Sequence, residues 1–151
     1  LLVKKLLQMK KFKFELEQVL EIREFERQQA EGELSKCIAV ENEINENLAI
    51  IANQYDALKK STKGSLDFSE MMGQSQYANL LDYQKEQLLL QLAQAKLETE
   101  EKRKVLTECM KKTSALEKMK ELQYEDYKLE LNQKENRRIE ELSSIKSFSE
   151  N

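Results

Sequence analysis

The residues best equipped for chemistry in this chain are its acidic side chains and its two cysteines. Asp and Glu together number 28, and paired carboxylates can act as general acid and base where a closed site separates their pKa values. Cys37 and Cys109 could pair with each other, bind a metal or serve a redox role. Histidine, the commonest general base and metal ligand, does not occur in the sequence.

The spacing of these groups supports none of this chemistry. The two cysteines are too few for a disulfide framework and lack the spacing of metal ligands, so we expect both to be small core residues. The three glycines lack the spacing of a phosphate-binding loop. The basic run 102–104 is bracketed by acidic residues that cancel a nucleic-acid footprint. We therefore predict a protein that is not an enzyme and takes no cofactor, metal, nucleic acid or small-molecule substrate.

The composition favours a helical interaction protein. Of the 151 residues, 35% are charged, three are Gly and none is Pro, whereas average usage would supply about ten Gly and about eight Pro. Sheets and compact loops need these turn-forming residues, so their scarcity predicts long elements joined by very few turns. The formal net charge of −3 provides no basic field that would attract nucleic acid.

The low cysteine count predicts an intracellular protein. Hydropathy predicts no membrane span, because the sequence has no run of 18 apolar residues. Residues 1–8 are apolar and basic and precede the first Met, Met9. We interpret them as an extra N-terminal segment, either disordered or non-native, that lacks the features of a cleaved signal. A short membrane-surface helix carrying Lys4 and Lys5 is the alternative interpretation of this segment.

A regular apolar seam predicts one long helix over residues 11–60. Alternating steps of four and three link thirteen positions, ten of which are apolar or Tyr, as in a coiled coil. The polar exceptions are Arg23, Arg27 and Glu41. The thirteen seam positions are Leu16, Leu20, Arg23, Arg27, Ala30, Leu34, Cys37, Glu41, Ile44, Leu48, Ile51, Tyr55 and Leu58.

A second helix is predicted over residues 76–147, with a looser seam that Thr99 and Lys102 interrupt. Residues 61–75 between the two helices are rich in Ser and Gly and form the predicted tip. The apolar positions of the second seam are Leu81, Leu88, Leu92, Ala95, Leu106, Cys109, Leu116 and Met119.

The short tip makes the two helices antiparallel neighbours, with residue i facing about residue 136 − i. In this register Leu48 meets Leu88 and Leu20 meets Leu116, so apolar positions coincide. The predicted fold is all-α: residues 9–151 form a single long antiparallel two-helix coiled-coil hairpin, whose second helix overhangs beyond about Tyr127. Two paired helices offer no concave site for catalysis.

Large apolar side chains gather around the predicted tip, where a thin segment cannot bury them all. They form either an exposed binding surface, for which adaptable Met side chains are suited, or a cap folded over the end of the coiled coil. These residues are Leu66, Phe68, Met71 and Met72, with Tyr77, Leu80 and Tyr83 close behind them off the seam.

The start of the first helix resembles the opening of the FliJ family, proteins of the bacterial flagellar type III export apparatus. That family typically begins Phe-x-Phe-x-Leu-x-x-Val-Leu-x-x-Arg, and every position of the pattern is filled here by Phe12, Phe14, Leu16, Val19, Leu20 and Arg23. The resemblance continues over residues 9–142, in Tyr77, Leu80 and Leu81 after the tip, in Leu116, Glu117, Lys118 and Tyr127, and in the charged tail 138–142.

The resemblance implies a role in flagellum biogenesis and bacterial motility. Proteins of this family form a stalk-like antiparallel coiled coil that enters the ring of the flagellar export ATPase and promotes its assembly. Their tip engages the membrane-embedded export gate, and they also handle export chaperones. The implied location is cytoplasmic, peripheral to the inner face of the cell membrane at the flagellar base.

Particular residues carry these implied roles. The ATPase-facing set consists of Phe12, Phe14, Leu16, Arg23, Leu116, Glu117, Lys118 and Tyr127, and the gate-facing set of Leu48, Tyr55, Tyr77, Leu80 and Leu81. For Leu16, Leu48, Leu81 and Leu116 a core role on the seam is the alternative. Phe12 and Phe14 alternate along the chain, so one can cover the seam while the other points elsewhere.

Two other functions are compatible with the same pattern. The equivalent stalk of a virulence-type secretion system would share the architecture, and only its partners would differ. A scaffolding coiled coil would form a stable oligomer and ignore ATPases.

Overall fold

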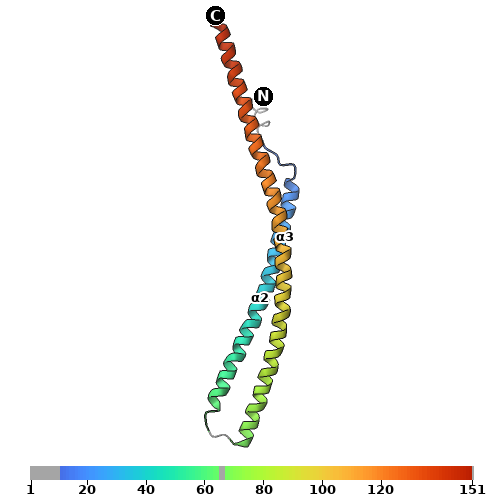
Figure 1. Ribbon diagram of the computed structural model, residues 1–151, viewed down its shortest axis with the longest axis vertical. Helices are drawn as coiled ribbons and strands as arrows, with labels where there is room; N and C mark the ends of the chain where they lie inside the picture. Colours follow the sequence, from blue (N-terminus) through green and yellow to red (C-terminus); the bar gives the residue numbers. More distant parts are fainter. Residues whose placement is uncertain (1–10, 65–66, 151) are drawn as a thin grey trace. The chain divides into compact units, whose positions relative to one another are not determined.

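The protein is an all-α hairpin of two long helices, seen in a computed structural model that describes residues 11–64 and 67–150 (Figure 1). Helix α2 spans Glu17–Ser61 and helix α3 spans Phe68–Ser149. No strand occurs in the described ranges. The extra segment predicted over residues 1–8 lies outside them.

The chain divides into two compact units, each an antiparallel pair of segments from α2 and α3. The terminal unit consists of Leu1–Arg27 and Cys109–Asn151, and the connection unit of Gln28–Glu108. The terminal unit carries both chain ends, and the connection unit carries the segment that joins the helices.

Helix α2 begins later than the predicted residue 11. Residues 11–14 have no regular structure, and a turn at residues 15–16 leads into the helix, where the Glu17 N–H donates to the Phe14 carbonyl at 3.1 Å. Acidic Glu17 in the first turn and basic Lys59 and Lys60 in the last turn complement the helix dipole. Local propensity favoured helix at residues 11–16, but the described chain there is not helical.

The connection is shorter than predicted. We expected it over residues 61–75, but α3 already begins at Phe68. Asp67 caps this helix, because its Oδ1 accepts a hydrogen bond from the Glu70 N–H at 2.7 Å. Eight residues that seemed suited to a turn, including Gly73, therefore form the first two turns of α3.

The seam predicted for α2 is confirmed. Twelve of its thirteen positions are buried or half-buried, and Leu16 alone is exposed, at 37%. The polar members Arg23, Arg27 and Glu41 are half-buried among their apolar neighbours. Alternating steps of four and three therefore select the face of α2 that packs against α3.

The seam of α3 is more regular than predicted, because polar residues occupy several of its positions. Thr99 and Thr113 are each 3% exposed, and their hydroxyls donate to the Ala95 and Cys109 carbonyls at 2.9 Å. The prediction of Met119 was wrong, since it is 41% exposed and Lys120 holds the seam position instead. A step of four from Leu116 accounts for this difference.

Contacts between the helices confirm the predicted register. In the terminal unit, Glu17 pairs with Lys120 at 2.8 Å, and the Thr113 hydroxyl reaches the Arg23 carbonyl at 3.2 Å. In the connection unit, the Tyr55 hydroxyl donates to Asp82. In each pair, the residue on α3 lies within one residue of the predicted partner, which is residue 136 − i for residue i of α2.

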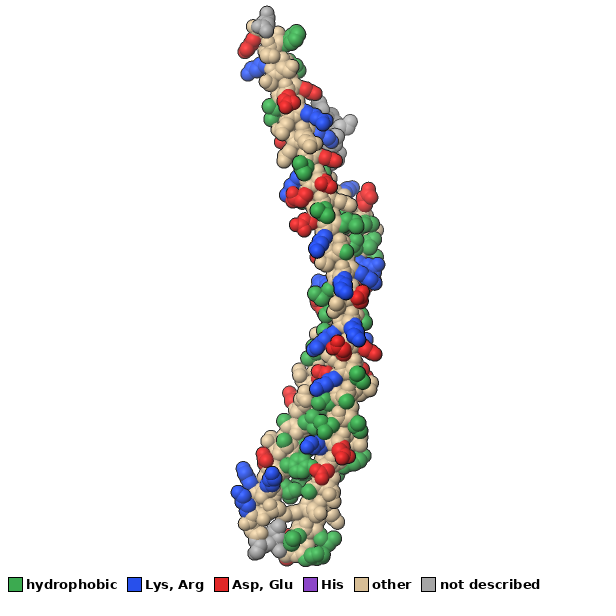
Figure 2. Space-filling model, viewed as in Figure 1, with side chains coloured by type: hydrophobic (Ala, Val, Ile, Leu, Met, Phe, Trp, Pro, Cys, Tyr) green, Lys and Arg blue, Asp and Glu red, His purple; other side chains and the backbone are tan. Residues whose placement is uncertain are grey.

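Both cysteines are free and half-buried. Within residues 11–64 and 67–150, no group of three or more His, Cys, Asp or Glu side chains is placed to hold a metal ion. Neither described helix has a stretch apolar enough to cross a membrane. What the molecule offers is surface, on which charged side chains of both signs alternate along the helices (Figure 2).

Candidate protein-binding surfaces

An aromatic cluster of Phe12, Tyr124 and Tyr127 joins the start of the described chain to α3 in the terminal unit. The Phe12 ring lies 5.3 Å from the Tyr124 ring, edge to face at 62°, and 5.6 Å from the Tyr127 ring. Lys128 places its Nζ 4.5 Å from the centre of the Tyr124 ring, at a distance typical of a cation–π contact. Edge-to-face pairs of this kind add roughly 0.5–1.5 kcal/mol to the burial of the rings.

The two phenylalanines of the opening pattern have different environments. Phe14 is 7% exposed and belongs to the core, whereas Phe12 is half-buried within the aromatic cluster. The two side chains therefore differ in burial although they are only two residues apart in non-helical chain. Phe12 is therefore the better candidate for contact with a partner.

An open groove of about 500 Å³ runs beside the aromatic cluster. Its lining combines aromatic and aliphatic side chains with charges of both signs: Phe12, Leu20, Glu24, Glu117, Lys120, Glu121 and Tyr124. Phe12 and Glu117 of this lining were predicted to be ATPase-facing. The groove therefore combines apolar and charged side chains, as protein interfaces usually do.

The ion pairs near this groove are weak. Glu17 pairs with Lys120 across the two helices, whereas Arg23 pairs with Glu26 within α2 at 3.0 Å. The side chains of all four residues are between 34% and 44% exposed, so each pair contributes about 1 kcal/mol or less. The terminal unit can therefore exchange these partners for those of another protein at low cost.

Other ATPase-facing candidates divide between core and surface. Leu116 is half-buried on the seam, whereas Glu117 and Lys118 are exposed. Tyr127 is half-buried, and its hydroxyl has no hydrogen-bond partner among the described residues. Sequence reasoning missed Tyr124, whose three-residue spacing from Tyr127 was the available signal.

The end of α3 beyond Tyr127, residues 128–149, forms the overhang. Leu131 is half-buried, but residues 132–149 are all exposed. Four large apolar side chains stand in this exposed stretch: Ile139 at 63%, Leu142 at 65%, Ile145 at 66% and Phe148 at 88%. Such side chains suit a helix that another protein covers.

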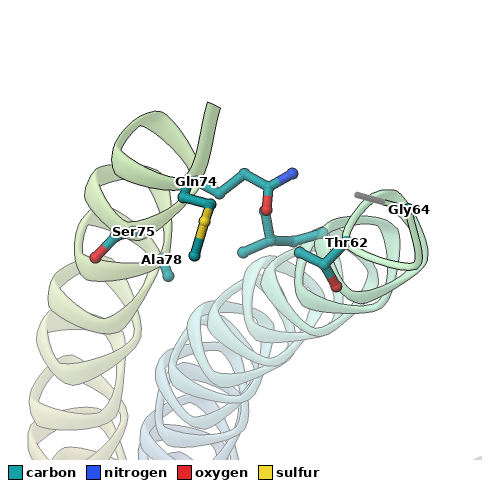
Figure 3. A pocket seen from close by; sticks show the side chains of 7 residues that line it. Thr62, Gly64, Gln74, Ser75 and Ala78 are labelled. Atoms are coloured by element: carbon teal, nitrogen blue, oxygen red, sulfur yellow. The ribbon is translucent and has the colours of Figure 1, made fainter. Parts of the chain in front are cut away.

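A second surface lies in the connection unit, where α2 and α3 diverge toward the segment that joins them (Figure 1). An open pocket of about 540 Å³ lies between the two helices there. Gln74 extends from α3 toward the end of α2 (Figure 3) and donates to the Ser61 hydroxyl at 3.4 Å. The small or polar residues Thr62, Gly64, Ser75 and Ala78 line the pocket together with Leu58, Met71 and Gln74.

Large apolar side chains near the connection are exposed rather than folded into a cap. Phe68 is 77% exposed, Met71 57% and Met72 49%. Leu66 lies outside the described residues. Because these side chains lie in the first two turns of α3 and are not buried, the binding-surface alternative fits them better than the cap.

The predicted gate-facing residues also divide between core and surface. Leu81 is 1% exposed and Leu48 is half-buried, so both pack on the seam. Tyr77 and Leu80 are 40% and 50% exposed, and Tyr83 beside them is 61% exposed. Tyr77 and Leu80 are therefore accessible to a partner, whereas Leu81 is not.

Tyr55 is held by Asp82 across the two helices. The Asp82 carboxylate accepts the hydrogen bond of the Tyr55 hydroxyl. This hydrogen bond, together with partial burial and the negative charge of Asp82, raises the pKa of Tyr55 to about 12, from an ordinary value of 10.0. The neutral phenol holds the bond, so its contribution to stability is complete below pH 10 and is lost as the pH rises through 12.

Replacing Asp82 with Asn tests this pairing. We expect the pKa of Tyr55 to fall from about 12 toward 10.0, because the charged acceptor is removed. The measurement is a titration followed by the ultraviolet absorbance of phenolate, with the Tyr55→Phe variant identifying the Tyr55 signal. An unchanged titration in Asp82→Asn would show that Asp82 does not hold Tyr55.

A comparison with protein-family models identifies a family to which this chain is similar. The model described as "Flagellar FliJ protein" matches residues 12–151. No curated protein and no solved structure matches the chain.

Proposed function

The chain belongs to the FliJ family, whose members take part in flagellar protein export, and from this premise we propose that it acts as the central stalk of the export machinery. In this role the terminal unit binds the ring of the export ATPase and promotes its assembly. The connection unit engages the membrane-embedded export gate, and the chain also handles export chaperones. The stalk works in the cytoplasm, at the inner face of the membrane below the flagellum.

The observation that carries the ATPase-facing role is the aromatic cluster beside the overhang. Phe12 and Tyr124 line a groove together with charged side chains, and aromatic side chains in such settings supply much of the binding energy of protein interfaces. The exposed apolar residues of the overhang, from Ile139 to Phe148, extend the same unit. Together they form a surface long enough to touch several subunits of a ring.

A stalk of mixed charge suits a ring physically. A helix pair that binds several subunits at once favours the assembled ring over free subunits by mass action. Exposed ion pairs are individually weak, so charges such as those of Glu117 and Lys118 can adjust to different ring positions without fixing one orientation.

The gate-facing role rests on the exposed residues near the connection. Tyr77, Leu80 and Phe68 are large apolar groups exposed on the first turns of α3, and Tyr55 is half-buried opposite Asp82. Leu48 and Leu81 support this surface from the seam. A membrane-bound gate or a chaperone could cover these residues with an apolar surface of its own.

Exchanging Phe12 for Ala tests the ATPase-facing role. We expect the concentration of protein that gives half-maximal ring assembly to rise about 30-fold or more, because the loss of an aromatic anchor costs about 2 kcal/mol or more. The measurement is light scattering of the export ATPase titrated with the variant. Helix content from circular dichroism should remain unchanged.

The Phe68→Ala variant is the matched control, since it removes an exposed Phe from the connection unit. It should leave ring assembly unchanged and weaken binding to the export gate. Equal effects of the two substitutions on ring assembly would contradict the division of roles between the two units.

A further inference from the structure

A groove of about 400 Å³ in the connection unit, between α2 and α3, has no charged residue in its lining, although 35% of the chain's residues are charged. Its nine lining residues are all uncharged, and five of them are amides: Asn47, Ile50, Ile51, Gln54, Tyr83, Gln84, Gln87, Leu88 and Gln91. The groove on another side, lined in part by Asp56 and Lys85, has charges of both signs.

An exposed apolar stripe borders the uncharged groove. Leu80, Tyr83, Leu90 and Leu97 are 50%, 61%, 66% and 64% exposed. They follow one another at steps of three and seven residues, which align them on one face of α3. Gln87 and Gln94 fill the two intermediate positions of this face. The stripe therefore has the spacing of a coiled-coil seam, on the side of α3 that α2 does not cover.

We propose that this uncharged groove and the apolar stripe beside it bind the same surface of a second copy of the chain, forming a two-fold symmetric dimer. A stripe with heptad spacing needs a helix with the same spacing, and the chain itself offers one. Each amide provides both a donor and an acceptor, so a surface rich in Asn and Gln is complementary to itself. The uncharged linings of two such grooves also meet without burying an unpaired ion.

The two-fold axis follows from the sequence of the stripe. Antiparallel copies that meet between Gln87 and Leu90 bring Leu80 of one copy beside Leu97 of the other. Each Tyr83 then lies near Gln94 of the second copy, where its hydroxyl can bond to an amide. The arrangement is isologous, so the same residues serve both copies and the assembly closes at two chains.

The size of the surface predicts a weak dimer. Residues 80–97 extend over about 27 Å of helix, and two helices side by side are about 20 Å wide. The footprint is therefore about 540 Å² per copy, or about 1,100 Å² in total, at the lower limit for specific interfaces. We expect a dissociation constant in the micromolar range, so that both monomer and dimer are populated in ordinary solutions.

Sedimentation equilibrium of the full chain, from about 1 to about 500 µM, measures this constant. We expect reversible dimerisation in the wild-type protein. The Gln87→Glu variant should weaken it about tenfold or more, since two copies then oppose like charges near the axis. The Gln87→Lys variant should do the same, whereas an equimolar mixture of the two should recover the dimer through opposite charges.

Leu89→Glu is the matched control, because Leu89 lines the charged groove instead and is 46% exposed. It should leave dimerisation unchanged, and circular dichroism should give the same helix content for every variant. A wild-type chain that stays monomeric throughout the range would overturn the proposal and leave the surface to a different partner. A dimer that Leu89→Glu weakens as strongly as Gln87→Glu, or that the mixture fails to recover, would also overturn it.

Discussion

Deleting residues 128–151 should weaken binding to the export ATPase about 100-fold or more and leave most of the hairpin's helix content in place. Residues 132–149 are exposed along their whole length, so their removal uncovers little of the seam. The deletion also removes Lys128 from the face of Tyr124 and four exposed apolar side chains, from Ile139 to Phe148. A binding titration against the purified ATPase measures the effect, with circular dichroism reporting the helix content.

A substitution variant separates the loss of apolar contacts from the loss of helix length. Ile139→Ser combined with Leu142→Ser keeps the full chain and should reproduce much of the weakening. The matched control combines Val105→Ser with Met110→Ser, which are both 51% exposed and lie before the overhang. If both double variants bind as the wild type does, the overhang is not the ATPase-facing surface.

Leu81→Ala should lower the free energy of unfolding by about 2–4 kcal/mol. Leu81 is the most deeply buried side chain described, at 1% exposure, and the seam of a two-helix hairpin has no second layer to fill the cavity. Its neighbour Leu80 is 50% exposed, so Leu80→Ala should change stability by only about 0.5 kcal/mol or less. Urea unfolding followed by circular dichroism compares the two variants.

The same pair of variants separates core from contact near the connection. Binding to the export gate should weaken in Leu80→Ala, because an exposed side chain is lost. For Leu81→Ala, binding to the export gate should stay near the wild-type value when it is measured at urea concentrations well below the unfolding midpoint of the variant. The opposite pattern, with a stable Leu81→Ala variant and a destabilised Leu80→Ala variant, would contradict the observed seam.

The seam could be predicted from the sequence wherever its residues are apolar. On α2 the positions from Ala30 to Leu58 alternate regularly, and hydrophobic burial decides which face packs. On α3 the predicted seam named Met119 and left out Thr113 and Lys120, because it was traced from apolar residues. Thr113 is buried at little cost since its hydroxyl reaches the Cys109 and Arg23 carbonyls, and Lys120 can bury its stem while its amino group pairs with Glu17.

The ends of the helices depended on single local contacts. Ser and Gly residues after Phe68 suggested a longer turn, but the cap that Asp67 provides starts α3 there. The candidate binding surfaces were only partly predictable, because they too depend on particular contacts between residues far apart in the sequence. The pattern at Phe12 and Phe14 pointed to the terminal unit, whereas the contact of Phe12 with Tyr124 depends on a register that spans more than a hundred residues.

The central claim is that this hairpin is the stalk of the export ATPase, and ring assembly tests it most directly. The full chain is added to the purified flagellar export ATPase while light scattering and phosphate release are recorded together. The stalk role predicts larger assemblies and faster ATP hydrolysis, both reaching a plateau near one chain per ring. A folded, helical chain that changes neither signal would contradict the role and favour a scaffolding coiled coil or the stalk of a different secretion system.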